Sequence, residues 1–161
     1  MNICICDDDK NIHGIIKHYM NSLYYKNIGI NIADLYSAEE LISAYNKETV
    51  FDIIFLDIEM HKISGIQAAE IIKQNYPETI IIFISNFPNY VFDVFKVEAL
   101  HFLTKPLSEI EFVNVFNRAL HKYKTTNSSI TLKWQNERYV IKINTIKYIE
   151  GYKRHITVYT K

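Results

Sequence analysis

Four short apolar runs in the sequence each end in polar side chains that could act on an anion. Runs of this kind are typical of β-strands that are buried on both faces. In an open parallel sheet the carboxyl ends of the strands meet at one edge, where ligands bind. We therefore expect these polar side chains to lie close together. They are Asp7 and Asp8 after residues 2–6, Asp57 within residues 51–60 (FDIIFLDIEM), Ser85 after residues 79–84, and Lys105 after residues 100–104.

The three aspartates at this edge predict a bound cation. Two like charges about 4 Å apart repel each other by about 4 kcal/mol at an effective dielectric constant near 20. Oxygen ligands that leave coordination positions for water suit Mg²⁺. A carboxylate nucleophile, Mg²⁺, a lysine and a hydroxyl together predict phosphoryl transfer to an aspartate. Each residue alone has a plainer interpretation, as a strand-ending or helix-starting aspartate, a loop hydroxyl or a surface lysine.

The apolar runs alternate with stretches of helical periodicity. Strands and helices alternate five times within about the first 124 residues. This predicts an α/β fold with a five-stranded parallel sheet and helices on both of its faces. The core residues expected on the last helix are Ile110, Val113, Phe116 and Leu120. The helices are expected after residues 7–9, from Ser37, from Ser64, over residues 89–97, and from Ser108 to about Lys124.

Four motifs, taken in order, resemble those of the receiver domains of two-component response regulators. They are CDDD at 6–9, FLDIEM at 55–60, FIS at 83–85 and HFLTKP at 101–106. The resemblance covers roughly residues 1–124 and implies a flavodoxin-like receiver fold. His61 stands where the family often has proline, and His101 where an acidic residue is common. Neither belongs to the reacting group.

The resemblance implies a role for each polar residue at the sheet edge. Asp57 would accept the phosphoryl group. Mg²⁺ would be held by Asp7, Asp8, Asp57 and the main-chain carbonyl of Glu59. The other implied roles are a switch hydroxyl, an inward-swinging aromatic ring, a contact to a phosphoryl oxygen and a proline after a cis peptide bond, for Ser85, Phe102, Lys105 and Pro106 respectively.

By this resemblance the chain is a signalling switch and not a metabolic enzyme, although slow autodephosphorylation is expected. A sensor histidine kinase would donate the phosphoryl group. Phosphorylation would then favour a homodimer through the fourth helix, the fifth strand and the last helix. An exposed apolar patch there would suit such an interface, with deep burial as the alternative. The candidate dimer residues are Phe92, Phe95 and Phe112.

Two other functions stay open at this point. The first is a receiver that acts through protein contacts or as a phosphate sink, with no DNA binding. The second is a Mg²⁺-dependent phosphatase with an aspartyl-phosphate intermediate, which would want a second carboxylate two residues after the nucleophile. Glu59 stands at that position, whereas Ser85, the Lys105-Pro106 pair and the short loops favour the receiver.

The sequence pattern changes after residues 125–129 (TTNSS), which are predicted to be a small polar linker. Residues 130–161 contain short β-like runs but are too few for an ordinary all-β domain, so we expect a shortened chain or strands that need a partner. The segment ITLKW…YVIKINTIKYIEGYKRHITVYT resembles the start of a LytTR-type DNA-binding domain, as in accessory-gene-regulator-type quorum-sensing response regulators. The resemblance implies promoter DNA as a partner, contacted by Lys153, Arg154 and His155, with solvated turn charges as the alternative.

The composition limits the other classes of function. Lysine plus arginine balance aspartate plus glutamate at 18 each, so no global field attracts nucleic acid. The sequence contains no run of 18 apolar residues, so no membrane span is predicted. The start of the sequence lacks the features of a signal peptide, which favours a cytoplasmic protein without membrane contacts. Cys4 and Cys6 share one face of a strand and are expected to be buried thiols.

Overall fold

Five strands form a parallel sheet with the strand order β2-β1-β3-β4-β5. The computed structural model describes residues 1–22, 29–90, 96–153 and 155–161. β3 and β4 are buried along their whole length, as continuous apolar runs should be when both faces are covered. The predicted five-stranded parallel sheet is confirmed. Its strands are β1 (Asn2–Cys6), β2 (Asn31–Leu35), β3 (Ile53–Asp57), β4 (Ile80–Ser85) and β5 (His101–Thr104).

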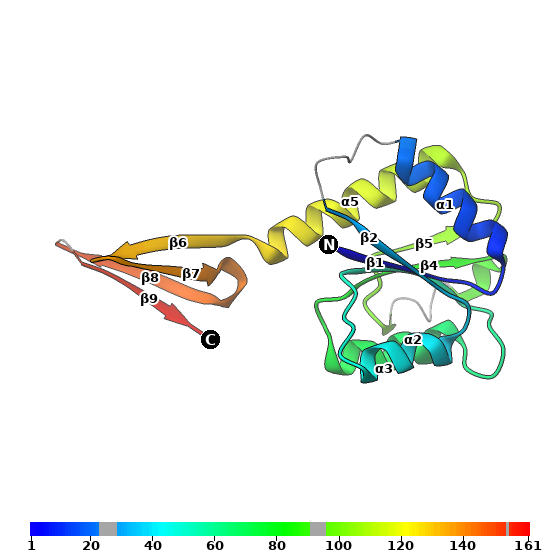
Figure 1. Ribbon diagram of the computed structural model, residues 1–161, viewed down its shortest axis with the longest axis horizontal. Helices are drawn as coiled ribbons and strands as arrows, with labels where there is room; N and C mark the ends of the chain where they lie inside the picture. The colour runs from blue at the N-terminus through cyan, green and yellow to red at the C-terminus, as the bar shows by residue number, and fades with distance from the viewer. Residues whose placement is uncertain (23–28, 91–95, 154) are drawn as a thin grey trace. The chain divides into compact units, whose positions relative to one another are not determined.

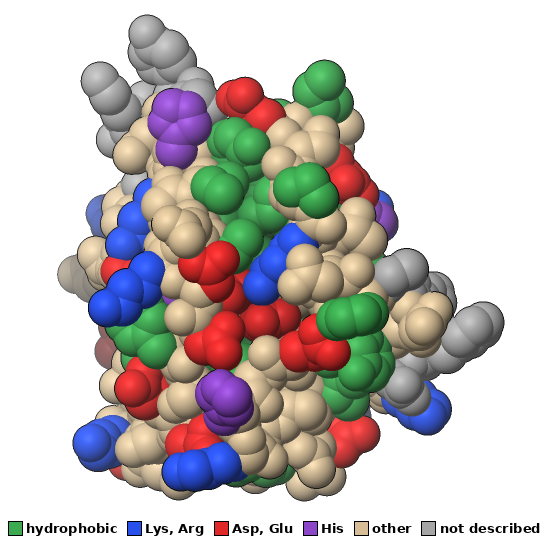
Figure 2. Space-filling view, turned by 90° about the vertical axis from the view of Figure 1, so that its right-hand side faces the viewer, with side chains coloured by type: hydrophobic (Ala, Val, Ile, Leu, Met, Phe, Trp, Pro, Cys, Tyr) green, Lys and Arg blue, Asp and Glu red, His purple; other side chains and the backbone are tan. Residues whose placement is uncertain are grey.

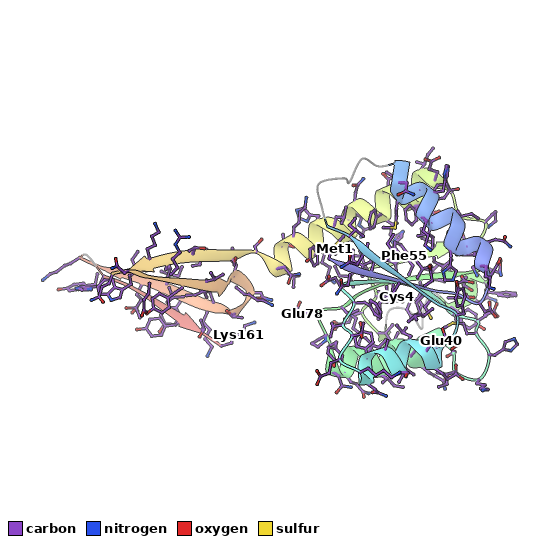
Figure 3. The ribbon with its side chains drawn as sticks, viewed as in Figure 1. Met1, Cys4, Glu40, Phe55, Glu78 and Lys161 are labelled. Carbon is purple, nitrogen blue, oxygen red and sulfur yellow. The ribbon has the colours of Figure 1, made fainter. Side chains whose placement is uncertain are left out.

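Helices cover both faces of this sheet (Figure 1). α1 (Lys10–Ser22) and α5 (Glu109–Asn127) lie on one face, and α2 (Ala38–Asn46) and α3 (Gly65–Asn75) lie on the other. Figure 3 shows Phe55 on the side of α1 and α5, and Cys4 on the side of α2 and α3. Both thiols are free and buried, as expected.

Aromatic packing fills the α1–α5 side of the sheet. The ring of Phe55 stacks on Phe112 with 5.3 Å between centroids, and Phe112 lies 5.8 Å from Phe116. All three side chains are almost completely buried. Burial of each such side chain contributes about 1.5–3 kcal/mol, so this cluster firmly fixes α5 against β3, the strand that ends in Asp57.

Side-chain caps set where α2 and α3 begin. Ser37 Oγ accepts a hydrogen bond from the main-chain N–H of Glu40 at 3.2 Å, as the sequence predicted. Ser64 and Gln67 form a complete capping box at the start of α3. Both helices therefore start at a defined residue, close after the carboxyl ends of β2 and β3.

The last helix differs from the prediction in its phase. Ile110 was expected in the core but is 77% exposed, so that prediction is wrong. Phe116 and Leu120 are buried as predicted, and Val113 is half-buried. Phe112, Val115 and Ala119 complete the buried face. Deep burial, the alternative to an exposed dimer patch, is therefore what the structure shows for Phe112. The expected helix over residues 89–97 lies mostly outside the described residues, with a 3-10 turn at Pro88–Tyr90 before it.

The chain divides into two compact units, Met1–Ala119 and Leu120–Lys161, and each is described by itself. α5 continues to Asn127, through the first three residues of the segment that was predicted as a linker. Beyond it, no described residue from Ser129 to Lys161 is buried. Two antiparallel hairpins follow, β6 (Ser129–Trp134) with β7 (Glu137–Lys142), and β8 (Ile146–Tyr152) with β9 (His155–Thr160), joined through the 3-10 turn Ile143–Thr145.

Among the described residues, no helix has the length and apolar character needed to cross a membrane.

Candidate functional site

The predicted acidic cluster forms at the carboxyl edge of the sheet. Asp7 and Asp8 follow β1, and Asp57 ends β3, its neighbour in the sheet. One oxygen from each of the three carboxylates lies within 4.8 Å of the others. Asp7 and Asp57 are buried, whereas Asp8 is exposed. Figure 2 looks onto this face, where acidic side chains gather around a hollow with a basic side chain beside them.

Lys105 reaches this cluster from the end of β5. Its Nζ lies 2.8 Å from Asp7 Oδ2 and 3.2 Å from Asp57 Oδ2, so one ammonium group pairs with two buried carboxylates. The main-chain N–H of Lys105 donates to the carbonyl of Ser85 at 2.9 Å, which ties the ends of β4 and β5 together. The following Lys105-Pro106 peptide bond is cis, as the sequence resemblance implied.

The chemistry of the cluster fits a hard divalent cation. Asp7 Oδ1 accepts the N–H of Asp9 at 2.9 Å. Asp7 Oδ2 is buried and close to Lys105 Nζ but accepts no hydrogen bond of proper geometry from the described residues. A buried carboxylate oxygen without an aligned donor is available to a metal ion, and three carboxylates in reach suit Mg²⁺. Glu59 lines the same 430 Å³ hollow as Asp8, Asp57 and Lys105.

The pKa of Asp57 is raised from its ordinary 3.8 to about 6. Burial is the largest cause and the neighbouring charge of Asp7 the second, while Lys105 acts in the opposite direction. Burial lowers the pKa of Lys105, but its contacts with the Asp7 and Asp57 carboxylates outweigh this, so the pKa of the ammonium is raised. At neutral pH the site therefore contains an ionised, poorly solvated Asp57 beside a charged lysine.

Replacing Asp57 by asparagine should stabilise the metal-free protein at neutral pH. Because its folded-state pKa is raised, ionisation of Asp57 costs stability, and this cost is absent below about pH 4 and complete above about pH 6. We expect the free energy of unfolding of Asp57→Asn to be about 2 kcal/mol higher than that of the parent at pH 7.5 and equal to it at pH 4. Urea unfolding in a chelator measures this difference; a deficit in the variant at pH 7.5 would contradict it.

Gly65 lets α3 begin directly against the end of β3. Its N–H donates to the carbonyl of Ile58 at 2.9 Å. A Cβ atom at Gly65 would lie 1.9 Å from the carbonyl oxygen of Asp57 and 2.9 Å from the carbonyl carbon. No side chain can occupy that space, so this glycine sets the main-chain position of Asp57.

Two further predicted receiver residues lie on the strands next to the acidic cluster: Ser85 ends β4, and Phe102 lies beside Phe83 in the register of β4 and β5. Ser85 is fully buried, and its Oγ accepts the N–H of Phe87 at 3.1 Å. Phe102 on β5 is partly buried and packs against the core on the side of α2 and α3. His61 is exposed and His101 is partly exposed, and the acidic cluster of the described residues contains neither of them.

Predicted DNA-contact residues lie in the second unit. Lys153 stands between β8 and β9, with Nζ 5.2 Å from the centroid of the Tyr152 ring. The ring of His155 is 6.2 Å from that of Trp134. Arg154, and the predicted dimer residues Phe92 and Phe95, lie outside the described residues.

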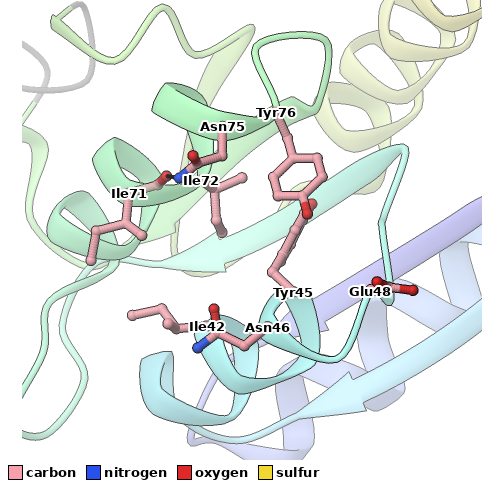
Figure 4. A pocket seen from close by; sticks show the side chains of 8 residues that line it. All are labelled: Ile42, Tyr45, Asn46, Glu48, Ile71, Ile72, Asn75 and Tyr76. Atoms are coloured by element: carbon pink, nitrogen blue, oxygen red, sulfur yellow. Dashed lines mark hydrogen bonds between the residues drawn. The ribbon is translucent and has the colours of Figure 1, made fainter.

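A second hollow, of 330 Å³, lies between α2 and α3 (Figure 4). Its lining is mostly isoleucine, asparagine and tyrosine, with Glu48 as the one carboxylate. The rings of Tyr45 and Tyr76 lie 4.8 Å apart in it. Without converging charges, this hollow lacks the equipment for phosphoryl chemistry, which favours the sheet edge as the functional site.

Comparison with known proteins assigns most of the first unit to a family. Residues 3–117 match the family described as the response regulator receiver domain. The transcriptional regulatory protein NatR of Bacillus subtilis is 27% identical over 130 residues, which are 78% of this chain and 56% of that protein. The sensory transduction protein LytT of Bacillus subtilis is 30% identical over 105 residues, 64% of this chain and 42% of that protein. The chain thus spans about half the length of the curated relatives it matches.

Solved structures share the fold of the first unit. The response regulatory domain of MrkE from Klebsiella pneumoniae aligns with a TM-score of 0.68 at 20% identity, over 77% of this chain and 98% of that one. The beryllofluoride-activated receiver domain of DrrB, a Thermotoga maritima protein, aligns with a TM-score of 0.63 at 24% identity, over 74% of this chain and 97% of that one. The flavodoxin-like fold expected from the sequence is confirmed.

Proposed function

Because this chain belongs to the response regulator receiver domain family, we propose that it is a phosphorylation-controlled switch whose Asp57 accepts a phosphoryl group from a sensor histidine kinase. The observation that carries the proposal is the convergence of Asp57, Asp7 and Asp8 with the ammonium group of Lys105, 3.2 Å from Asp57 Oδ2. A nucleophile, an acidic metal site and a fixed cation are the parts that this transfer requires.

In the transfer step, a carboxylate oxygen of Asp57 forms a bond to phosphorus. The bond from phosphorus to the kinase's histidine nitrogen breaks, and the nitrogen keeps the electron pair. Mg²⁺, held by Asp7, Asp8, Asp57 and the main-chain carbonyl of Glu59, would supply positive charge to the phosphoryl oxygens. Lys105 already lies against Asp57 Oδ2 and gains a phosphoryl oxygen as its partner.

The phosphoryl group then acts on the end of β4. It adds negative charge and acceptor oxygens beside Asp57. Ser85 Oγ accepts the N–H of Phe87, which leaves the hydroxyl proton free to be donated to a phosphoryl oxygen. Phe102, which is partly buried, would move inward as Ser85 moves. The switch is thus a local electrostatic change that shifts the packing of β4 and β5.

For the output we propose control of transcription. Residues 1–124 would be the receiver, 125–129 the linker, and 130–161 the beginning of a LytTR-type domain that binds promoter DNA through Lys153, Arg154 and His155. The names of NatR, a transcriptional regulatory protein, and LytT, a sensory transduction protein, support this role. The protein would act in the cytoplasm as a homodimer in its phosphorylated form, through the surface of the fourth helix, β5 and α5.

Phosphorylation by a small donor tests the proposal. With acetyl phosphate and Mg²⁺, the parent chain should gain one phosphoryl group by intact-mass spectrometry. Asp57→Asn should take it up at least about 100-fold more slowly, because an amide is not a nucleophile for phosphorus.

Asp52→Asn is the matched control, since Asp52 precedes the same strand and its Oδ2 accepts the main-chain N–H of Asn2. It should be phosphorylated like the parent. Equal uptake by Asp57→Asn would refute the assignment, and steady turnover of a phosphate ester by the parent would favour the phosphatase alternative.

A further inference from the structure

His13 is a buried histidine on α1 whose two ring nitrogens both have close partners. The side chain is only 5% exposed. Nε2 lies 2.8 Å from the main-chain carbonyl oxygen of Asp7, and Nδ1 lies 2.8 Å from Asp34 Oδ1 on β2. The ring also stacks on Tyr36, with 4.7 Å between ring centroids. Three elements of the fold therefore meet at this one side chain.

Both partners of the imidazole can only accept hydrogen bonds. A main-chain carbonyl has no proton to donate. Burial opposes ionisation of Asp34, but its hydrogen bonds with Lys17 and His13 outweigh this and lower the pKa of the carboxyl, so it is an ionised acceptor. Both ring nitrogens of His13 thus lie at hydrogen-bond distance from acceptor oxygens, so the imidazole bridges the Asp7 carbonyl and Asp34.

The contact with His13 completes a set of restraints on Asp7. The N–H of Asp7 donates to the carbonyl of Leu35 at 3.2 Å, and Asp7 Oδ1 accepts the N–H of Asp9 at 2.9 Å. With the carbonyl of Asp7 held by His13, the remaining oxygen is Oδ2, the buried atom that faces Lys105 and accepts no aligned hydrogen bond from the described residues.

The far end of the bridge is itself anchored. Asp34 Oδ2 pairs with Lys17, one turn along α1 from His13, and Asp34 lies beside Ile5 in the register of β1 and β2. The imidazole thus joins the start of α1 and the strand β2 to the residue that follows β1. Removing it would free the carbonyl of Asp7 to rotate and would change the direction of the carboxylate.

We infer that His13 is a positioning residue, which aims the carboxylate of Asp7 at the cation of the acidic site by bridging the Asp7 carbonyl to Asp34. The inference rests on the proposed function, because it assigns Asp7 to Mg²⁺ binding. Groups that orient a metal ligand typically change metal affinity by about 10–100-fold when they are removed.

Mg²⁺ binding to the full chain, measured by isothermal titration calorimetry, tests the inference. His13→Phe keeps a ring to stack on Tyr36 but donates no hydrogen bond, and its Kd for Mg²⁺ should rise about 10-fold. An unchanged or lower Kd overturns the inference.

Ile16→Val is the matched control. Ile16 is fully buried on the same helix, one turn from His13, and has no polar contact. The control should lose stability while its Kd for Mg²⁺ stays within about twofold of the parent. A rise in Kd as large as that of His13→Phe would mean that general loosening of α1 is the cause, which would also overturn the inference.

Asp34→Asn gives a second, milder change if His13→Phe folds poorly. It should raise the Kd for Mg²⁺ in the parent background, and in the His13→Phe background it should add nothing, because the bridge is already broken. Failure of the parent to accept a phosphoryl group at Asp57 would refute the proposed function, yet the Mg²⁺ affinities would still decide the role of His13. A parent chain that binds no Mg²⁺ would refute the positioning role.

Discussion

Replacing Gly65 by alanine is expected to lower the free energy of unfolding by about 3 kcal/mol or more and to reduce phosphorylation of Asp57 at least about 10-fold. The added methyl group would lie 1.9 Å from the carbonyl oxygen of Asp57 and 3.1 Å from Ile58 Cα. All the nearby atoms belong to the main chain, which has no rotamer to change. The clash can be relieved only if α3 moves away or the end of β3 moves.

Movement of either element has a cost. α3 is held at its start by the Ser64–Gln67 capping box and by the hydrogen bond from Gly65 to the carbonyl of Ile58. Ala68 and Ala69 pack it closely against the sheet, and both are fully buried. If β3 yields instead, Asp57 moves relative to Lys105 Nζ, and a displacement near 1 Å is enough to lower a transfer rate severely.

Gly14→Ala is the control for this prediction. Apart from its chain neighbours and the backbone of its own helix, no atom of the described residues lies within 4 Å of a Cβ built at Gly14, which is exposed on α1. Alanine has the higher helix propensity, so this variant should match the parent or gain up to about 1 kcal/mol. Urea unfolding followed by circular dichroism, with acetyl phosphate labelling of the same samples, compares the two. A Gly65→Ala variant as stable as Gly14→Ala would disprove the steric argument.

The sequence was sufficient to predict the sheet and its functional edge. β3 and β4 are continuous apolar runs, and such runs indicate buried parallel strands without tertiary information. Once five strands alternate with helices, topology brings their carboxyl ends together. The convergence of Asp7, Asp57 and Lys105 follows from that topology, and the contacts in the structure agree with it.

The sequence was insufficient where two apolar patterns compete on one helix. In α5, Ile110 and Val113 continue one helical stripe, while Phe112, Val115 and Ala119 form another, and both stripes can include Phe116. Periodicity alone cannot choose between them. The choice comes from Phe55 on β3, which stacks on Phe112 and leaves Ile110 on the exposed side.

Contacts between residues that are far apart in the chain also could not be predicted from the sequence. His13 lies on the same stripe as the buried residues Ile12, Ile16 and Met20, which was a signal of burial that helical spacing could have given. What no local pattern contains is its partner Asp34, 21 positions away on β2. Gly65 was missed for a similar reason, because the main chain of β3 that forbids a side chain there is brought near only by the fold.

Lys105→Met is expected to lower the free energy of unfolding by about 3 kcal/mol at pH 7.5 in a chelator. Methionine keeps much of the length and apolar character of lysine but removes the charge. The side chain of Lys105 is 11% exposed, and it is the cation that pairs with both Asp7 and Asp57. Removing one partner of a buried ion pair typically costs about 3–5 kcal/mol of stability, because the remaining charge stays buried without a partner. For Lys105→Met we expect a loss at the low end of this range.

Unlike the loss caused by a packing defect, this loss of stability should depend on both pH and Mg²⁺. Lys105 lowers the pKa of Asp57, so without it that pKa rises further above 6. A raised folded-state pKa destabilises the protein when the pH is above that pKa, and has no effect when the pH is below the unfolded-state pKa. The deficit in stability should therefore be largest at pH 7.5 and should shrink toward pH 4. Mg²⁺ should restore part of the stability, since it replaces the missing positive charge among the three carboxylates.

Urea unfolding at pH 7.5 and pH 4, each with and without Mg²⁺ in place of the chelator, measures these effects. Lys122→Met, on an exposed position of α5, is the control and should stay within about 0.5 kcal/mol of the parent under all four conditions. A deficit in Lys105→Met that is equal at both pH values and insensitive to Mg²⁺ would mean that lost packing is the cause. The predicted pattern would instead establish that the lysine balances the charge of the buried carboxylates in the metal-free protein. A divalent cation would supply positive charge to the same carboxylates when it binds.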